Sequence, residues 1–183
     1  MPWTVLQDAS QEHILTGEGI IMDENQRYFD IIAKQESMLQ FTTFTADTAL
    51  EIGLKLVERA RKEERAIAIS IIRNGFTLFA HNMEGTSPDN DLWIAGKNYL
   101  VNRFLKSSLF MAKKIRAGQT RQDDRIGIYV AGGAFPLKVK GVGVVGTITV
   151  SGLHEDDDHG WTVEILKGML NQPDCPSLSS REG

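Results

Sequence analysis

The 183-residue chain has few of the features that would assign it to a class of protein at once. It contains one cysteine, Cys175, so no disulfide can form within one chain, and a reducing compartment such as the cytoplasm is expected. Its Lys and Arg residues form no run longer than the pair at 113 and 114, and the formal net charge is -4. A general electrostatic attraction to nucleic acid is therefore not expected.

Long apolar runs are also missing. The longest extends from Ala66 to Ile72, is interrupted by Ser70, and is far too short to span a bilayer. The N-terminus lacks a basic segment followed by an apolar run, which is the pattern of a secretory signal. We therefore predict a cytoplasmic protein without membrane insertion.

Catalytic motifs are absent in the same way. No G-x-S-x-G element surrounds Ser151, and Cys175 lies in a polar tail between two prolines, so neither hydrolase chemistry nor a Cys and His pair is indicated. The segment from Gly141 to Gly146 fits the G-x-G-x-x-G pattern of dinucleotide-binding folds. It is followed by a β-branched run over residues 147–150, which predicts a strand where that fold requires a helix. We expect no dinucleotide site and no catalytic residues.

What the chain does contain is a glycine-rich stretch. Seven of its 17 glycines lie between Gly127 and Gly152, interleaved with β-branched residues. The backbone there is expected to approach something closely. The sequence leaves two alternatives open, a strand pair packed tightly against a neighbouring element or a backbone-lined ligand pocket.

Hydrophobic periodicity predicts a single α/β (α+β) domain over residues 24–170, with helices over a largely antiparallel sheet of five strands. Asn74 and Gly75 form a two-residue hairpin turn, and Thr45 caps a helix. We predict an N-terminal arm over 1–23 and a disordered tail over 171–183. The helices are predicted over 24–35, 45–62, 92–116 and 155–170, and the third of them restarts at residues 107 and 108. The strands are predicted over 39–43, 66–73, 76–80, 126–131 and 143–151. A short strand extension is also predicted at 137–139.

An acidic cluster runs from His154 to His159 and holds two imidazoles and four carboxylates. Such side chains are metal ligands, so His154, Asp158 and His159 are candidate ligands of a metal ion. The alternative is a solvated helix start, where the helix dipole favours acidic residues. Three residues that precede the long central helix, Asp89, Asn90 and Asp91, are expected to cap it.

Basic residues near the glycine-rich stretch suggest an anion site. The loop of Gly132, Gly133 and Phe135 supplies backbone amides, and basic side chains would supply paired hydrogen bonds to a carboxylate or phosphate. Each cation could equally be an ordinary solvated charge. The candidate ligand-binding residues are Arg73, Lys97, Arg103, Gly132, Gly133, Phe135 and Lys138.

Several segments together resemble the UPF0303 family. They are residues 71–75, 88–93, 102–108, 132–136 and 141–152, with Asp158 and His159 after them. That family is related to the heme-degrading domain group, which also includes glycolate-locus accessory and PduO C-terminal-like domains. The resemblance covers residues 24 to 170.

This resemblance implies a profilin-like or PAS-like α/β/α fold, assembly into homo-oligomers, and in some relatives the binding of heme or another tetrapyrrole. It also implies an alternative function, since one fungal member resembles an accessory factor in the delivery of tail-anchored proteins to the endoplasmic reticulum. A chaperone or targeting factor would then be a partner. The iron ligand is not fixed by the resemblance and has to be sought among His13, His81, His154 and His159.

The N-terminal arm adds an independent reason to expect self-association. It carries large apolar side chains without a helical or strand period, and such groups are costly to leave exposed. We therefore predict at least a homodimer, with the arm or the first helix in an interface. The residues concerned are Trp3, Val5, Leu6, Ile14, Leu15, Ile20 and Ile21.

Overall fold

A computed structural model describes the backbone of residues 18–120 and 129–178, and the side chains of these ranges from Gln26 onward. Within these ranges the chain forms five helices and four strands. They are α1 (Glu18–Met38), α2 (Ala46–Lys62), β1 (Ala68–Arg73), β2 (Phe76–Asn82), α3 (Pro88–Phe104), α4 (Ser108–Arg116), β3 (Ala134–Val139), β4 (Gly143–Ser151) and α5 (Glu155–Met169).

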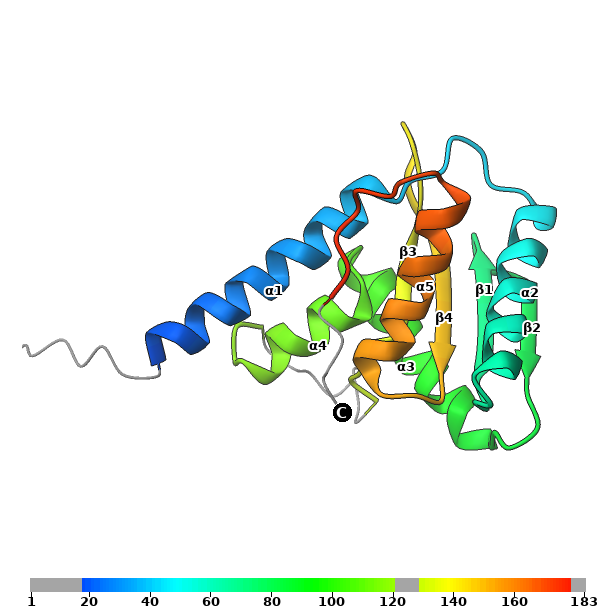
Figure 1. The fold of residues 1–183 in the computed structure, drawn as a ribbon, viewed down its shortest axis with the longest axis horizontal. Coiled ribbons are helices and arrows are strands. Elements are labelled where there is room, and N and C mark those ends of the chain that lie inside the picture. The colour runs from blue at the N-terminus through cyan, green and yellow to red at the C-terminus, as the bar shows by residue number, and fades with distance from the viewer. Residues whose placement is uncertain (1–17, 121–128, 179–183) are drawn as a thin grey trace, which may run out of the picture.

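The four strands form one antiparallel sheet in the order β2-β1-β4-β3. Helices α2 and α5 cover one face of this sheet and α3 covers the other, while α1 and α4 lie beside β3 (Figure 1). The predicted α+β class and antiparallel sheet are confirmed. No helix in the described ranges has the length and apolar character needed to cross a membrane.

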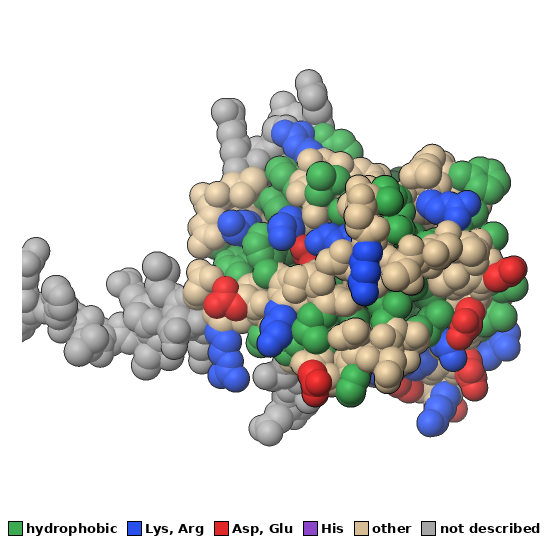
Figure 2. Space-filling view, turned by 90° about the horizontal axis from the view of Figure 1, so that it is seen from above, with side chains coloured by type: hydrophobic (Ala, Val, Ile, Leu, Met, Phe, Trp, Pro, Cys, Tyr) green, Lys and Arg blue, Asp and Glu red, His purple; other side chains and the backbone are tan. Residues whose placement is uncertain are grey.

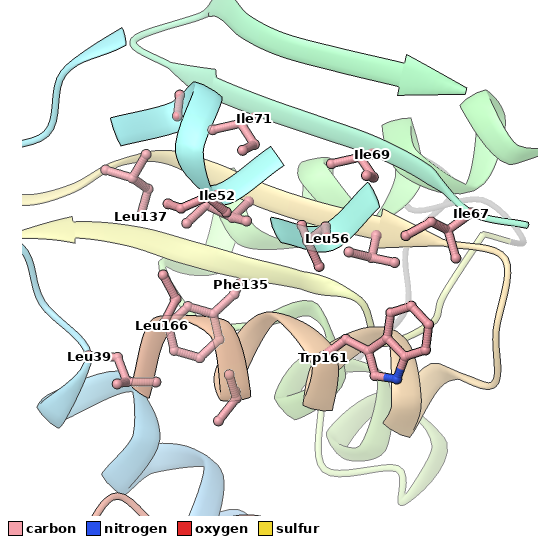
Figure 3. Close-up of a cluster of buried hydrophobic side chains, with 14 of the residues drawn as sticks. Leu39, Ile52, Leu56, Ile67, Ile69, Ile71, Phe135, Leu137, Trp161 and Leu166 are labelled. Carbon is pink, nitrogen blue, oxygen red and sulfur yellow. The ribbon is translucent and has the colours of Figure 1, made fainter. Parts of the chain in front are cut away.

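The main core lies between the sheet and the helix pair α2 and α5. Figure 3 shows Ile52 and Leu56 from α2 near Ile69 of β1, and Phe135 of β3 above α5, where Leu166 lies. All five are at most 1% exposed. Removing side chains of this size from water is the main source of folding free energy, at about 2 kcal/mol each.

Local sequence signals explain where most elements begin and end. Thr45 caps α2 through its side chain, as predicted. Asn74 and Gly75 both have positive φ and connect β1 to β2, which confirms the hairpin turn. The N-cap residue of the central helix is Ser87, with Pro88 in the first turn, and the prediction of Asp89 or Asp91 as the cap is wrong. Asn90 does contribute to the cap, because its Oδ1 accepts a hydrogen bond from Ser87 N at 2.9 Å.

The number of strands is four, so the prediction of five is wrong. In the segment predicted as a strand at 39–43, Phe41 alone makes a bridge, to Val139 at the end of β3. Residues 129–131 of the strand predicted at 126–131 are irregular, and 126–128 lie outside the described residues. The strand forms instead at Ala134–Val139, and Pro136 is tolerated because β3 is an edge strand.

The two ends of the domain also differ from the prediction. Helix α1 begins at Glu18, within the predicted arm, of which residues 1–17 lie outside the described residues. The expected disorder does not hold for residues 171–178. Cys175 is 2% exposed, and Gln35 Nε2 donates a hydrogen bond to Pro176 O at 2.8 Å, so this segment lies against α1.

Candidate functional site

Two residues that the sequence placed in separate candidate sites meet in a buried ion pair. Lys97 Nζ on α3 lies 2.7 Å from Asp158 Oδ2 on α5, with side-chain exposures of 3% and 2%. The same ammonium donates to Val150 O at 2.9 Å, and Asp158 Oδ1 accepts from Leu153 N at 3.0 Å. Burial raises the pKa of Asp158 to about 6, against the opposing effect of Lys97. The pair lines a cavity of about 250 Å³ between α3, the end of β4 and the start of α5.

Several glycines of the central stretch are required by close packing. A Cβ on Gly133 would lie 2.4 Å from Val150 O and 2.7 Å from Lys97 Nζ. One on Gly146 would lie 1.8 Å from Ile72 O. Such distances cannot be reached without moving backbone. Of the two alternatives for this stretch, these contacts favour tight packing of strands and helices over a backbone-lined pocket, and Gly146 lies inside β4 as predicted.

Glu155 holds the loop before β3 in place. Its carboxylate accepts from Gly132 N at 3.0 Å, pairs with Arg116, and lies 3.3 Å from Lys113 Nζ. Burial alone would raise the pKa of Glu155, but the bonds from Arg116 and Gly132 and the charge of Lys113 together hold it below its usual value. The amide of Gly132 is thus already used by the protein.

The remaining predicted ligand residues lie apart. Arg73 Nη1 donates to Phe44 O at 2.6 Å, Phe135 is fully buried in the core, and Arg103 extends over the rings of Tyr99 and Phe104. Lys138 Nζ lies 3.5 Å from Glu36 Oε2. On the face seen in Figure 2, some Lys and Arg side chains lie close together around a carboxylate, and others are spread over the rest of the face. The structure therefore brings together Lys97 and Gly133, but not the whole predicted set.

Glu36 is a buried carboxylate that the sequence did not indicate as part of any site. It is fully buried on α1, accepts from Ser107 N at 2.7 Å, and lies 3.2 Å from Lys106 Nζ as well as near Lys138. Its spacing from Phe29 and Ile32, on the apolar side of the helix, could have indicated a buried carboxylate.

The three predicted metal ligands point in different directions. Asp158 pairs with Lys97, His154 caps α5, and His159 is fully buried with Nε2 2.8 Å from Gln35 Oε1. Within the ranges that the structure describes, no group of three or more His, Cys, Asp or Glu side chains could hold a metal ion. The helix-start alternative accounts for the acidic cluster, with all four carboxylates in the first turn of α5.

A larger cavity of about 780 Å³ opens between the end of α2 and the start of α5, and His154 is one of its lining residues. His154 is 45% exposed, and its Nδ1 lies 3.4 Å from Asp156 Oδ2. The Arg59 guanidinium covers the indole of Trp161 at 4.5 Å from the ring centroid, and Arg65 also lines the cavity. No local pattern in the sequence indicates Arg59, Arg65 or Trp161, because the end of α2 and the start of α5 are far apart in the chain and come together only in the fold.

Comparison with known proteins gives a consistent assignment. The model of the family described as "Haem degrading protein HbpS-like" matches residues 44–167. A UPF0303 protein of Streptomyces coelicolor is 41% identical over 146 residues, covering 77% of this chain and 92% of the relative. A UPF0303 protein of Serratia proteamaculans is 38% identical over 144 residues, covering 76% and 89%.

Solved structures share the fold. The Ybr137w protein aligns with a TM-score of 0.67 at 24% identity, covering 85% of this chain and 96% of its own. A double mutant of Streptomyces reticuli HbpS aligns with a TM-score of 0.58 at 23% identity, covering 72% and 89%. A PduOC:heme complex aligns with a TM-score of 0.58 at 13% identity, covering 75% and 99%. At these identities the likeness extends to the fold alone.

Proposed function

Because the chain belongs to the HbpS-like family of haem-degrading proteins and to the UPF0303 proteins, we propose that it binds haem or a related tetrapyrrole. The observation that carries the proposal is the cavity of about 780 Å³ that His154 shares with two arginines and a tryptophan. Its volume is in the range of small-molecule sites, about 300–1,000 Å³.

The lining residues fit the parts of a haem. An imidazole is a common ligand of haem iron. The Nδ1 of His154 caps α5 by accepting a hydrogen bond from Asp156 N at 3.3 Å, and this bond fixes the orientation of the ring, so an iron ion would be held through Nε2. Leu153 and Ala66 supply apolar surface for the macrocycle, while Trp161 lies beneath Arg59 at the cavity wall. Glu63, Glu64 and Asp157 also line the cavity.

The propionates of a haem would need cations at the rim. Arg65 is exposed and pairs with none of the described carboxylates. Arg59 is bound to Glu63 at 2.8 Å, so it is the less available of the two. We therefore assign Arg65 as the main propionate partner and His154 as the iron ligand. Bound haem would supply a redox-active iron, while these side chains would hold and orient it.

Titration with hemin, followed by the Soret band, tests this proposal. The chain should saturate at one haem per cavity, and His154→Asn should abolish or shift the Soret band, because asparagine keeps the helix cap but removes the imidazole. Arg65→Ala should weaken binding about tenfold, the effect of one charge-assisted hydrogen bond.

The matched control is His81→Asn, which removes an imidazole from the exposed strand β2. If His81→Asn removes the Soret band and His154→Asn does not, the site is misassigned. If the unmodified chain gives no saturable Soret band, haem binding itself is wrong.

A second candidate function is that of an oligomeric adaptor, in which the chain presents apolar surface to a partner such as a targeting factor. The observation that favours it is the exposure of Leu50 and Leu54 on α2 and Phe76 on β2, at 47%, 54% and 70%. An oligomer together with a blank haem titration would favour this function.

A further inference from the structure

A second cavity lies on the opposite face of the sheet. Helix α3 lies mainly over β4 and β3, which leaves a groove of about 560 Å³ between α3 and the strands β1 and β2. Its walls are largely apolar. They are formed by Ile72, Thr77, Ala80, Ile94 and Ala95. None of the lining residues is shared with the cavity beside His154.

The floor of this groove is polar. Ser70 and Asn98 line it, and they are 8% and 7% exposed. Ser70 is the register partner of Thr149, whose hydroxyl donates to Asn98 Oδ1 at 2.5 Å. Among the described residues, neither Asn98 Nδ2 nor Ser70 Oγ has a hydrogen-bond partner. Two donors on nearly buried residues are therefore open to the groove, where an acceptor of a ligand would replace the solvent that reaches them.

We propose that this groove binds a small, flat, largely apolar molecule that carries a carbonyl group. The amide of Asn98 and the hydroxyl of Ser70 would donate to the carbonyl oxygen, and the apolar walls would cover the rest of the molecule. No Lys or Arg lines the groove, and Asp91 adds a carboxylate at the N-terminal part of α3. The carboxylate disfavours an anionic ligand, and the apolar walls disfavour a charge of either sign, although His81 also lines the groove. The ligand class is therefore neutral.

The experiment uses the full chain and the fluorescent probe Prodan, a neutral naphthalene that carries a carbonyl group. Its emission shifts to shorter wavelength in an apolar site. We expect a saturable blue shift at one probe per chain. Ser70→Ala should weaken probe binding about fivefold, the effect of one hydrogen bond.

A filled groove provides the decisive variant. Ala80 is the register partner of Ser70 on β2, so a phenylalanine at that position would occupy the groove on an exposed strand where aromatic residues are well tolerated. Ala80→Phe should weaken probe binding at least tenfold. The matched control is Ala46→Phe at the exposed start of α2, which should leave probe binding unchanged. Circular dichroism verifies that both variants fold.

Three results would overturn the proposal. They are an absence of saturable probe binding, an equal loss in the Ala80→Phe and Ala46→Phe variants, and a change of molar mass in Ala80→Phe by light scattering. The last result would identify the groove as an interface with a second copy. A His154→Asn variant separates this site from the haem site, because it should lose haem and keep the probe.

Discussion

At the scale of single residues, the buried imidazole of His159 connects the first and last helices. Its Nε2 is 2.8 Å from Gln35 Oε1, its ring lies 5.6 Å from that of Phe135, and its Nδ1 has no hydrogen-bond partner in the described part of the chain. Burial lowers the pKa of His159 from 6.5 to about 4. The neutral ring is therefore the form that the folded protein holds at neutral pH.

This lowered pKa predicts a loss of stability in acid. Between pH 6.5 and about 4 the unfolded chain binds a proton at His159 that the folded chain does not, so the free energy of unfolding falls as the pH drops through that window. The contribution is on the order of 3 kcal/mol. A His159→Gln variant lacks this pH-dependent contribution. The difference in free energy of unfolding between the variant and the unmodified chain, measured by urea unfolding, should therefore change by about 3 kcal/mol between pH 7 and pH 4.

Asp158 makes the comparison between variants necessary. Its raised pKa means that the folded chain binds the extra proton between pH 3.8 and about 6, so its contribution rises as the pH falls. The two groups oppose each other, and the unmodified chain alone would show a reduced slope. His81→Gln controls for removing an imidazole. An unchanged difference between His159→Gln and the unmodified chain across the window would contradict the prediction.

The residue scale is where the sequence predicted least. It identified Lys97, Gly133, Asp158 and His159 as chemically unusual, but it assigned them to an anion site and a metal site. Lys97 and Asp158 lie 61 positions apart, and nothing local determines that they pair. The attraction between two buried charges repays their desolvation penalty only when their geometry is good. That geometry is determined by tertiary packing and not by the spacing of the two residues in the sequence.

At the scale of elements, β4 is the strand on which the sheet depends. It pairs with both β1 and β3, and its glycine at 146 faces Arg73 on one side and Leu137 on the other. The pairing register shifts between Leu137 and Lys138 in β3 and between Ile71 and Ile72 in β1. The backbone of β4 at Gly146 lies so close to the backbone of β1 that there is no room for a side chain.

Gly146→Ala should strongly destabilise the protein. The new Cβ would lie 1.8 Å from Ile72 O, a backbone atom of the central strand β1 that cannot rotate away. We expect a loss of about 3 kcal/mol or more in the free energy of unfolding, measured by urea denaturation. The control is Gly168→Ala in α5, where no atom lies within 4 Å of the added Cβ. That substitution should stabilise by up to about 1 kcal/mol, and similar effects in the two variants would refute the packing argument.

Element boundaries followed from the sequence where a local signal exists. Thr45, the Asn74 and Gly75 turn, the restart at Ser107 and the acidic start of α5 all act within a few residues, and all are found. Strand β3 was only partly predicted, as the extension at 137–139. Gly132, Gly133 and Pro136 favour a loop locally, and an edge position in the sheet overrides that preference.

At the scale of the whole molecule, the layered arrangement leaves apolar side chains uncovered at the β2 edge. Helix α2 packs against this edge strand, where the ring of Phe79 lies against Gly53. Leu50 and Leu54 lie one turn apart on the same helix and are about half exposed, and Phe76 on β2 is 70% exposed. A strand at a sheet edge with apolar neighbours is a surface that proteins usually cover.

This surface and the apolar residues of the N-terminal arm both favour self-association. Burying Leu50, Leu54 and Phe76 in a partner would contribute roughly 2 kcal/mol each before ordering costs. We therefore predict at least a homodimer for the full chain by light scattering. The double variant Leu50→Glu with Leu54→Glu should lower the molar mass, and a chain starting at Glu18, which keeps α1 intact, tests the arm separately.

The control for the charge reversal is Leu92→Glu, which places the same carboxylate at another half-exposed leucine, on α3. It should leave the molar mass unchanged, because Leu92 lies on the other side of the sheet from α2. A monomeric full chain would contradict self-association and, with it, the adaptor function. An oligomer that persists in both the double variant and the shortened chain would instead place the interface elsewhere, since neither of the two apolar surfaces would then be needed to hold the copies together.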